Sequence, residues 1–218
     1  EAKGGKWIDD AVPGDSVGPA VQRIVAGDPM GAAKMQSTDM DELHKAGLLA
    51  DIDQVAADNK WKDRLPDFVW NSINRDGHVL AAPVNAQSEV WLWYNKGVFD
   101  KAGIQEPQSY DELFANMDKI KAAGVIPLAV GGQPWQLNIL FLKILAGVAP
   151  DSYLQMQSAD YEKAINSDGF KKAAEIMGKL RAYDYEGSPG RQWNVAVTMV
   201  ATGQAALREM GDWAKGEF

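Results

Sequence analysis

The sequence predicts an α/β fold, in which the strands of a sheet alternate with helices. Short apolar runs alternate along the 218 residues with segments of helical periodicity. Several of these segments begin at a capping Ser, Asp or Asn and end at a Gly, as helices commonly do. With 46% apolar and 24% charged residues, the composition is that of a globular chain and not of a disordered one.

The first third of the chain is predicted to form short elements. Asp15 or Ser16 caps a helix that ends at Gly27, and Pro66 suits the first turn of a helix over 67–73. The other elements expected here are a strand at 6–12, a buried strand at 32–35, a helix capped by Ser37 or Thr38 and ended by Gly47, and a short helix within 48–57.

A hairpin and a buried strand are predicted next. Asp76-Gly77 is a strong signal for a two-residue hairpin turn. Two apolar runs follow, at 79–84 and 90–94. The second run is apolar on both faces, which is typical of a buried central strand. A helix over 95–102 comes after it, closed by Gly103.

The last half of the chain alternates strands with longer helices. Ser109 and Glu112 form a capping box at the start of a helix that runs to Ala123. Ser167 begins another long helix. The remaining elements expected are strands at 125–130 and 205–210 and helices at 136–145 and 194–201.

Charge and residue usage exclude several classes of function. The formal net charge is -8, and an acidic chain binds nucleic acid poorly because phosphates need a basic surface. The absence of Cys excludes disulfides, thiolate metal sites and cysteine nucleophiles. The longest uncharged run, 124–142, is too mixed in polarity to span a membrane. We expect no nucleic-acid partner and no membrane-spanning segment.

Signatures of common enzyme classes are also missing from the sequence. It contains no dinucleotide fingerprint, no P-loop, no GxSxG elbow and no HExxH. His44 and His78 fall in a helix and a hairpin, where surface or structural roles are expected. We therefore expect no catalytic residue, no metal and no cofactor.

Polar and aromatic residues follow several predicted strands. The residues concerned are Lys34 and Gln36, Asn85 and Gln87, Gln133 and Trp135, and Asp212 and Trp213. Ligands of open α/β sheets bind just beyond the carboxyl ends of the strands. A Trp face beside a hydrogen-bonding group suits a sugar, whose ring presents C–H faces and a rim of hydroxyls. The pattern favours a cleft for a polar small molecule.

Six stretches, in a fixed order over most of the chain, carry a family resemblance. They are 25–29 (VAGDP), 46–52 (AGLLADI), 83–85 with 91–96 (PVN, WLWYNK), 99–104 (FDKAGI), 126–129 with 131–136 (IPLA, GGQPWQ) and 210–216 (MGDWAKG). Together they resemble the solute-binding components of bacterial ABC sugar importers. The likeness is greatest to the glucose- and mannose-binding branch of the group that includes maltose-binding protein.

The resemblance implies two α/β lobes joined by a hinge that closes on the ligand. Residues 1–105 would form mostly the N-terminal lobe and residues 106–218 mostly the C-terminal lobe, each incomplete. It implies a periplasmic protein that captures a monosaccharide such as glucose and delivers it to the membrane permease of an ABC importer, without catalysis.

The resemblance also implies the residues of the sugar site. Trp213 would stack on the sugar and Trp135 would form a second wall of the cleft, with Asp212 beside them. Gln87, and Lys34 or Gln36, would bond sugar hydroxyls. Close relatives carry His where Gln87 stands, so the exact sugar stays open.

Members of this family are considerably longer than 218 residues. We therefore expect this chain to be part of a binding protein, which a complementary chain or fragment would complete. A partial fold leaves sheet edges and apolar faces uncovered.

Two other functions stay open at this point. A carbohydrate-active hydrolase would also place Trp in a cleft, but it needs a second carboxylate to work with Asp212. A binding protein for a disaccharide or a polyol would show the same residue pattern, and only ligand screening separates it from a monosaccharide-binding protein.

Overall fold

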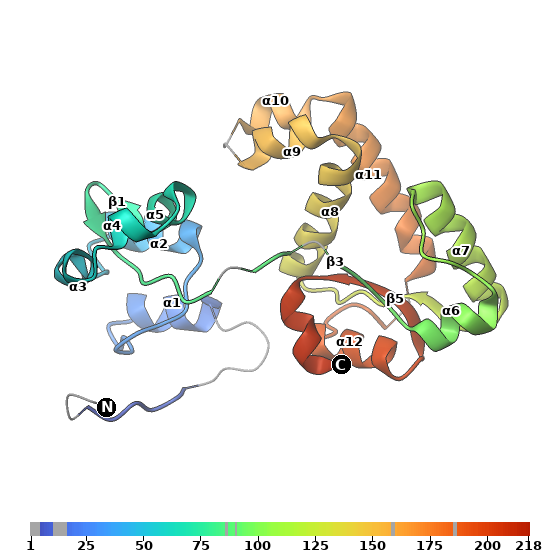
Figure 1. Cartoon of the computed structure of the whole chain (residues 1–218), viewed down its shortest axis with the longest axis horizontal. Coiled ribbons are helices and arrows are strands. Elements are labelled where there is room, and N and C mark those ends of the chain that lie inside the picture. The colour runs from blue at the N-terminus through green and yellow to red at the C-terminus, as the bar shows by residue number, and fades with distance from the viewer. Residues whose placement is uncertain (1–4, 11–16, 86, 90, 158–159, 185–186) are drawn as a thin grey trace. The chain divides into compact units, whose positions relative to one another are not determined.

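The computed structural model describes residues 5–10, 17–85, 87–89, 91–157, 160–184 and 187–218. The chain divides into two compact units, residues 1–86 and residues 87–218, which we call the first and the second unit (Figure 1). The lobe boundary predicted at 105/106 lies inside the second unit. It refers to the lobes of a complete binding protein and stays a prediction.

The first unit consists of short helices and one hairpin. Its elements are α1 (Val17–Val25), α2 (Ser37–Lys45), α3 (Asp53–Asp58), α4 (Trp61–Arg64), α5 (Asp67–Ile73), β1 (Asn74–Arg75) and β2 (His78–Val79). The hairpin turn is confirmed, because Asp76 (φ 53°) and Gly77 (φ 87°) both have the positive φ that a tight two-residue turn requires. Ala56, Ile73 and Val79 form a small core with Trp61 and Trp70.

Several strands predicted in the first unit are not present among its described residues. Residues 6–10, 32–35 and 80–84 have no regular structure. A strand needs a hydrogen-bonded neighbour, and the only ladder in the described part of this unit joins β1 to β2. Gln36 occupies the N-cap position of α2, where Ser37 or Thr38 was expected. The predicted caps Asp15 and Ser16 lie outside the described residues.

The second unit is built on the sheet of β3 (Trp91–Tyr94), β4 (Ile126–Leu128) and β5 (Ala205–Met210), in the order β3-β5-β4. β3 pairs antiparallel with β5, and β4 pairs parallel with β5. The prediction of a buried central strand at 90–94 was therefore wrong. β5 is central, whereas β3 lies at an edge and Trp91 is 49% exposed.

Residues of β3 pack against apolar clusters on both faces: Leu92 and Tyr94 against the main core, and Trp93 against the cluster around Met210. Because side chains two residues apart share a face, the rings of Trp91 and Trp93 stack with their centroids 5.8 Å apart. Phe218 stacks on Trp93 at 5.0 Å. This packing on both faces gives β3 the apolar sequence of a core strand, although it lies at the edge of the described sheet.

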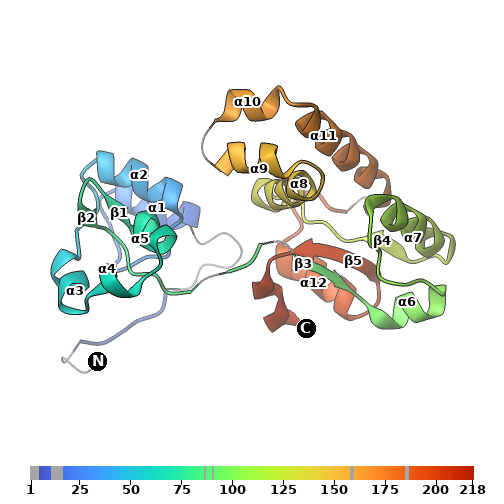
Figure 2. The same ribbon diagram turned by 45° about the horizontal axis from the view of Figure 1, so that its top comes forward.

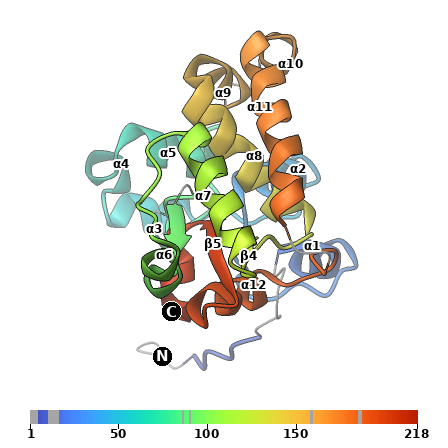
Figure 3. The ribbon, with the colours of Figure 1, turned by 90° about the vertical axis from the view of Figure 1, so that its right-hand side faces the viewer.

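Helices cover both faces of this sheet. The helices of this unit are α6 (Lys96–Ala102), α7 (Tyr110–Ala122), α8 (Pro134–Val148), α9 (Pro150–Gln157), α10 (Tyr161–Ile165), α11 (Asp168–Leu180) and α12 (Trp193–Ala201), with the 3-10 turns η1 (Arg181–Tyr183) and η2 (Asp212–Glu217), and α9 and α10 pack on other helices. Figure 2 shows α8 and α11 on one side of the sheet and α12 on the other. Helices α8 and α11 pack against each other (Figure 3).

Local capping signals in the second unit are confirmed. Ser109 Oγ accepts the backbone N–H of Glu112 at 3.2 Å, and the Glu112 carboxylate reaches back to the N–H of Gln108. Ser167 Oγ accepts the N–H of Phe170 at 3.0 Å. The main core lies between the sheet and helices α7, α8 and α11, around Met117, Ile144 and Leu207. No described helix combines the length and the apolar character that a membrane crossing requires.

Candidate functional site

The carboxyl ends of β4 and β5 lie at the same edge of the sheet, because the two strands are parallel. The chain leaves β4 through Gly131-Gly132 and enters α8, which carries Trp135 in its first turn. It leaves β5 through Gly211 and enters η2, which carries Trp213 in its first turn. The topology therefore brings together the two tryptophans that we selected from the sequence.

Both tryptophans belong to one aromatic cluster. Val197, Met210 and Ala214 are buried at its centre, and half-buried Trp93, Trp135, Trp193 and Trp213 pack around them. Trp93 also donates from Nε1 to the carbonyl of Met210 at 3.1 Å. We did not predict from the sequence that Trp93 and Trp193 lie here. Trp193 directly precedes the helix predicted at 194–201, and helical periodicity does not indicate where a helix packs.

The segment between β4 and α8 is held by two arginine side chains and one backbone hydrogen bond. From β5, Arg208 Nη1 donates to the carbonyl of Ala129 at 3.2 Å. From the segment before α12, Arg191 Nη1 donates to the carbonyl of Val130 at 2.8 Å. The backbone N–H of Gly132 donates to the carbonyl of Ser188 at 2.8 Å. A loop fixed in this way holds Gln133 and Trp135 in place before any ligand arrives.

Close packing explains the glycine pair of this loop. A Cβ at Gly131 would lie 2.2 Å from Oε1 of Gln136, and a Cβ at Gly132 would lie 2.6 Å from the carbonyl oxygen of Ser188. The neighbours of Gly132 are backbone atoms, so this position needs Gly for space, whereas a side chain at Gly131 would displace the buried Gln136 amide.

Arg208 carries a buried positive charge beside this loop. It is 1% exposed, and its Nη2 donates to Oε1 of Gln136 at 2.8 Å. Burial, and then the nearby charge of Arg191, lowers the pKa of Arg208 to about 9. At neutral pH the guanidinium is therefore still protonated and can act only as a donor.

Asp212 has a structural partner inside the second unit. Its Oδ2 accepts the backbone N–H of Ser88 at 3.1 Å, and its own N–H donates to the carbonyl of Ser88 at 2.9 Å. These two hydrogen bonds attach the exposed segment 87–89 to Asp212, just beyond the end of β5. Gln87 belongs to this segment. One carboxylate oxygen of Asp212 is thus already used by the protein.

The other two predicted site residues belong to the first unit. Lys34 and Gln36 are exposed, and they lie in the irregular segment that precedes α2. They do not follow a strand as the sequence analysis expected. Their role in a sugar site stays a prediction.

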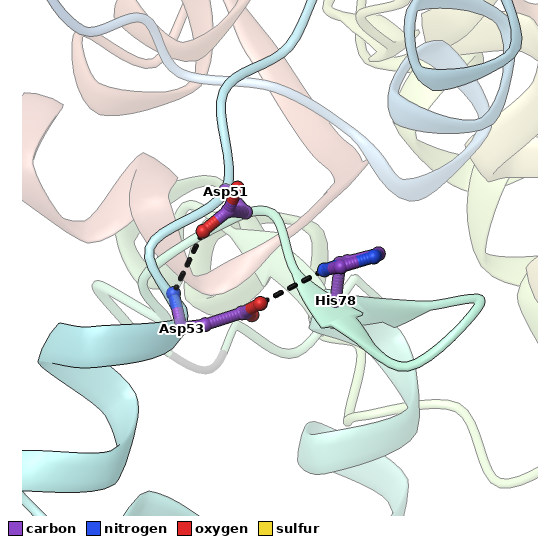
Figure 4. A group of neighbouring side chains, drawn as sticks. All are labelled: Asp51, Asp53 and His78. Carbon is purple, nitrogen blue, oxygen red and sulfur yellow. Dashed lines mark hydrogen bonds and ion pairs between the residues drawn. The ribbon is translucent and has the colours of Figure 1, made fainter.

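The structure also assembles a group that the sequence analysis did not anticipate, around His78. His78 Nδ1 lies 2.8 Å from Oδ2 of Asp53, whose Oδ1 accepts the N–H of Val79 at 2.6 Å. Figure 4 shows Asp51 beside this pair, and one ligand atom of each residue lies within 4.8 Å of the others. Both oxygens of Asp53 are satisfied by protein groups, so this arrangement is an ion pair that joins α3 to the hairpin.

Comparison with known proteins identifies a family for the whole chain. The sequence profile of the bacterial extracellular solute-binding proteins matches residues 1–218. A probable sugar-binding periplasmic protein of Brucella suis is 40% identical over 222 residues, which cover 100% of this chain and 53% of that protein. The chain therefore spans about half the length of this relative.

Solved structures share the fold. The bacterial solute receptor AcbH, described as having an exclusive preference for β-D-galactopyranose, has a TM-score of 0.75 at 23% identity, covering 92% of this chain and 52% of AcbH. A solute-binding protein of Agrobacterium vitis S4 with bound D-mannitol has a TM-score of 0.65 at 20% identity, covering 90% of this chain and 48% of that protein. At these identities the likeness concerns the fold alone.

Proposed function

The chain belongs to the bacterial extracellular solute-binding protein family, and from this membership we propose that it captures a monosaccharide for an ABC importer. The permease of that importer would be its membrane partner. An extracellular family agrees with the periplasmic location that the sequence resemblance implied.

The observation that carries the sugar assignment is the meeting of Trp135 and Trp213. They come from the ends of two parallel strands, are half-buried, and pack on the same apolar centre. Aromatic faces that are fixed at a strand edge match the C–H face of a pyranose. Gln133 lies two positions before Trp135 and Asp212 directly before Trp213 in the sequence, and both carry polar groups. Such a combination of a few polar groups with apolar walls is typical of small-molecule sites.

We propose a glucose-like monosaccharide as the ligand because the resemblance points to the glucose- and mannose-binding branch. The fold neighbours named above bind a galactopyranose and a polyol, so both ligand classes belong in the screen. A disaccharide, which is a larger ligand, is a further alternative.

A hydrolase is less well supported than a binding protein. Asp212 is the acid nearest the tryptophans in sequence, and its Oδ2 is engaged by the backbone N–H of Ser88. A general acid needs a carboxyl group that is free to donate its proton to the glycosidic oxygen. Sustained release of product from an aryl glycoside would overturn the assignment as a non-enzymatic binding protein.

We further propose that additional sequence completes this fold. The relative from Brucella suis is almost twice as long as the region that matches. Large apolar side chains are exposed in both units, among them Phe68 (73%), Val84 (92%) and Trp91 (49%). Apolar surface of this kind marks an interface or an uncovered core. A cooperative thermal unfolding transition of the 218-residue chain alone, with strong near-UV circular dichroism, would contradict this proposal.

The experiment is a calorimetric titration of the whole protein with D-glucose, D-galactose, D-mannitol and maltose. We expect saturable binding that is selective for one monosaccharide. Trp213→Ala and Trp135→Ala should each weaken that binding by at least about tenfold, because each removes a stacking face. Trp70→Phe, in the core of the first unit, is the control. Equal affinity in all variants would place the sugar elsewhere.

A further inference from the structure

Three polar side chains form a continuous relay from the sheet to the proposed site. Arg208, on the central strand β5, donates from Nη2 to Oε1 of Gln136 at 2.8 Å. Gln136 Nε2 in turn donates to Oε1 of Gln133 at 2.8 Å, and to the backbone carbonyl of Arg191 at 3.3 Å. Gln133 is the N-cap residue of α8, two positions before Trp135.

The buried Arg208 guanidinium determines how the amides of Gln136 and Gln133 are oriented. A guanidinium has N–H donors and no acceptor, so the side chain facing it must present an oxygen. Gln136 therefore points its carbonyl oxygen at Arg208 and its amide nitrogen away from it. The amide nitrogen can only meet an acceptor, which orients the Gln133 amide with its oxygen inward.

Burial prevents the alternative orientation. Gln136 is 3% exposed, and its amide packs so closely on Gly131 that a Cβ there would lie 2.2 Å from Oε1. A reversed Gln136 amide would put N–H groups against the guanidinium and against no acceptor. Buried donors without partners are disfavoured.

The orientation of the relay determines which atom of the Gln133 amide is available to a ligand. The oxygen of Gln133 is used by Gln136, and no acceptor among the described residues pairs with Gln133 Nε2. Gln133 is only partly buried, so its amino group remains for a partner from outside. That partner must offer an acceptor oxygen.

We propose that Arg208 is a positioning residue that acts through Gln136 to make Gln133 a hydrogen-bond donor toward the ligand beside Trp135. Gln133 is then a specificity-determining residue, which selects a ligand with an acceptor oxygen next to an apolar face. The identity of the ligand rests on the proposed sugar-binding function. The orientation of the relay is a property of this chain and is tested without any ligand.

The first experiment measures hydrogen exchange of the two glutamine side-chain amides by ¹⁵N NMR in the whole protein. In the wild type the Gln136 amide should exchange at least about tenfold more slowly than the Gln133 amide, because only Gln136 donates inside the protein. Gln136→Glu converts the middle of the relay into an acceptor that pairs with Arg208. Gln133 must then turn its amino group inward, so its exchange should become at least about tenfold slower.

Two further variants separate orientation from packing. Arg208→Lys keeps a donor and should keep the wild-type exchange rates. Arg208→Met removes the donor and should reduce the difference in exchange rate between the Gln136 and Gln133 amides. If Arg208→Met fails to fold, the exchange rates of Gln136→Glu alone test whether the relay orients Gln133. Unchanged exchange of the Gln133 amide in Gln136→Glu would overturn the proposal.

The second experiment titrates the same variants with whichever of D-glucose, D-galactose and the polyol D-mannitol the wild type binds best. Gln136→Glu should weaken binding by at least about tenfold, since Gln133 would now present its oxygen to the ligand. The control is Gln105→Glu, an exposed site with the same change of charge, which should bind as the wild type does. Equal binding by Gln136→Glu would overturn the role of Gln133 in specificity. If the wild type binds none of the sugars, the proposed function fails, and the exchange experiment still decides the relay.

Discussion

The indole of Trp213 lies against the Cα of Gly211, with no room for a side chain between them. A Cβ built at Gly211 would come within 2.1 Å of Cζ3 and 2.3 Å of Cη2 of the indole. Gly211 has an ordinary backbone conformation, with φ of -66°. Glycine is needed here for space and not for backbone freedom, and the contact fixes the ring at the end of β5.

Gly211→Ala should therefore displace the Trp213 ring. We expect a shift of tryptophan emission, weaker sugar binding and a loss of stability of about 1–3 kcal/mol, the usual cost of overpacking. Fluorescence, calorimetric titration and urea unfolding measure the three effects. Gly216→Ala is the matched control, since a Cβ there meets nothing within 4 Å. If the two variants behave alike, the ring is not held by Gly211.

Asn95 joins two helices of the second unit through one amide. Its Oδ1 caps α6 by accepting the N–H of Val98 at 3.0 Å, and its Nδ2 donates to the carbonyl of Val200 in α12 at 2.8 Å. Asn95→Ala should lower the free energy of unfolding by about 2 kcal/mol, because both bonds are lost. Asn95→Ser keeps a capping oxygen and should lose less. Equal losses in urea unfolding would show that the cap contributes little.

Glu209 places a carboxylate inside the second unit. Its side chain is 5% exposed, with Lys143 Nζ at 3.4 Å from Oε1. Its Oε2 has no hydrogen-bond partner among the described residues. Burial raises the pKa of Glu209, although Lys143 opposes the shift. The folded state therefore holds this proton more tightly than the unfolded state, so the stabilisation is present at low pH and is lost as the pH rises through the raised pKa.

Glu209→Gln should remove this pH dependence. The variant should gain stability relative to the wild type near neutral pH, and the difference should shrink as the pH falls toward 4.5, the ordinary value for a Glu carboxyl. Urea unfolding between about pH 5 and pH 8 measures it. Glu175→Gln, at an exposed position of α11, serves as the control. A constant difference across this range would argue against ionisation of Glu209 as the cause.

The ion pair of Asp53 and His78 gives the first unit a pH window of its own. The hydrogen bond and charge of Asp53 raise the pKa of His78, and the N–H of Val79, followed by His78, lowers the pKa of Asp53. The His78 contribution is full below 6.5 and is lost as the pH rises through the raised pKa. The Asp53 contribution is full above 3.8 and is lost as the pH falls through the lowered pKa.

His78→Gln should remove the loss of stability that the wild type shows as the pH rises through the pKa of His78. Both side chains are partly exposed, so the effect should be small and should weaken further with added salt. NMR titration of the His78 ring in the wild type gives its pKa directly, and the ring should titrate above 6.5. Titration at or below that value would mean that the pair does not form in solution.

Features encoded within a few residues could be predicted from the sequence. The hairpin at Asp76-Gly77, the caps Ser109 and Ser167, and the closing Gly103 are all found in the structure. Each depends on the backbone preference of a residue or on a hydrogen bond to an amide three positions away. Such local features do not depend on how the rest of the chain packs.

Features that depend on distant partners could not be predicted. Residues 32–35 have a strand-like composition, yet no described neighbour pairs with them. Trp91 and Trp93 resemble core residues but lie on an edge strand, because β5 takes the central place. The helices α9 and α10 were missed because their short polar sequences carry little helical periodicity.

The sequence by itself determined the α/β class, the acidic and cysteine-free character, the family resemblance, and the choice of Trp135 and Trp213 as site candidates. Only the tertiary structure decided that these two rings share one apolar centre, that Asp212 is bound to Ser88, and that Gln136 is hydrogen-bonded to both Arg208 and Gln133. The physical reason is that capping and turn preferences are local. The partner of a strand, a buried charge or an amide is chosen by which distant segments the fold brings into contact.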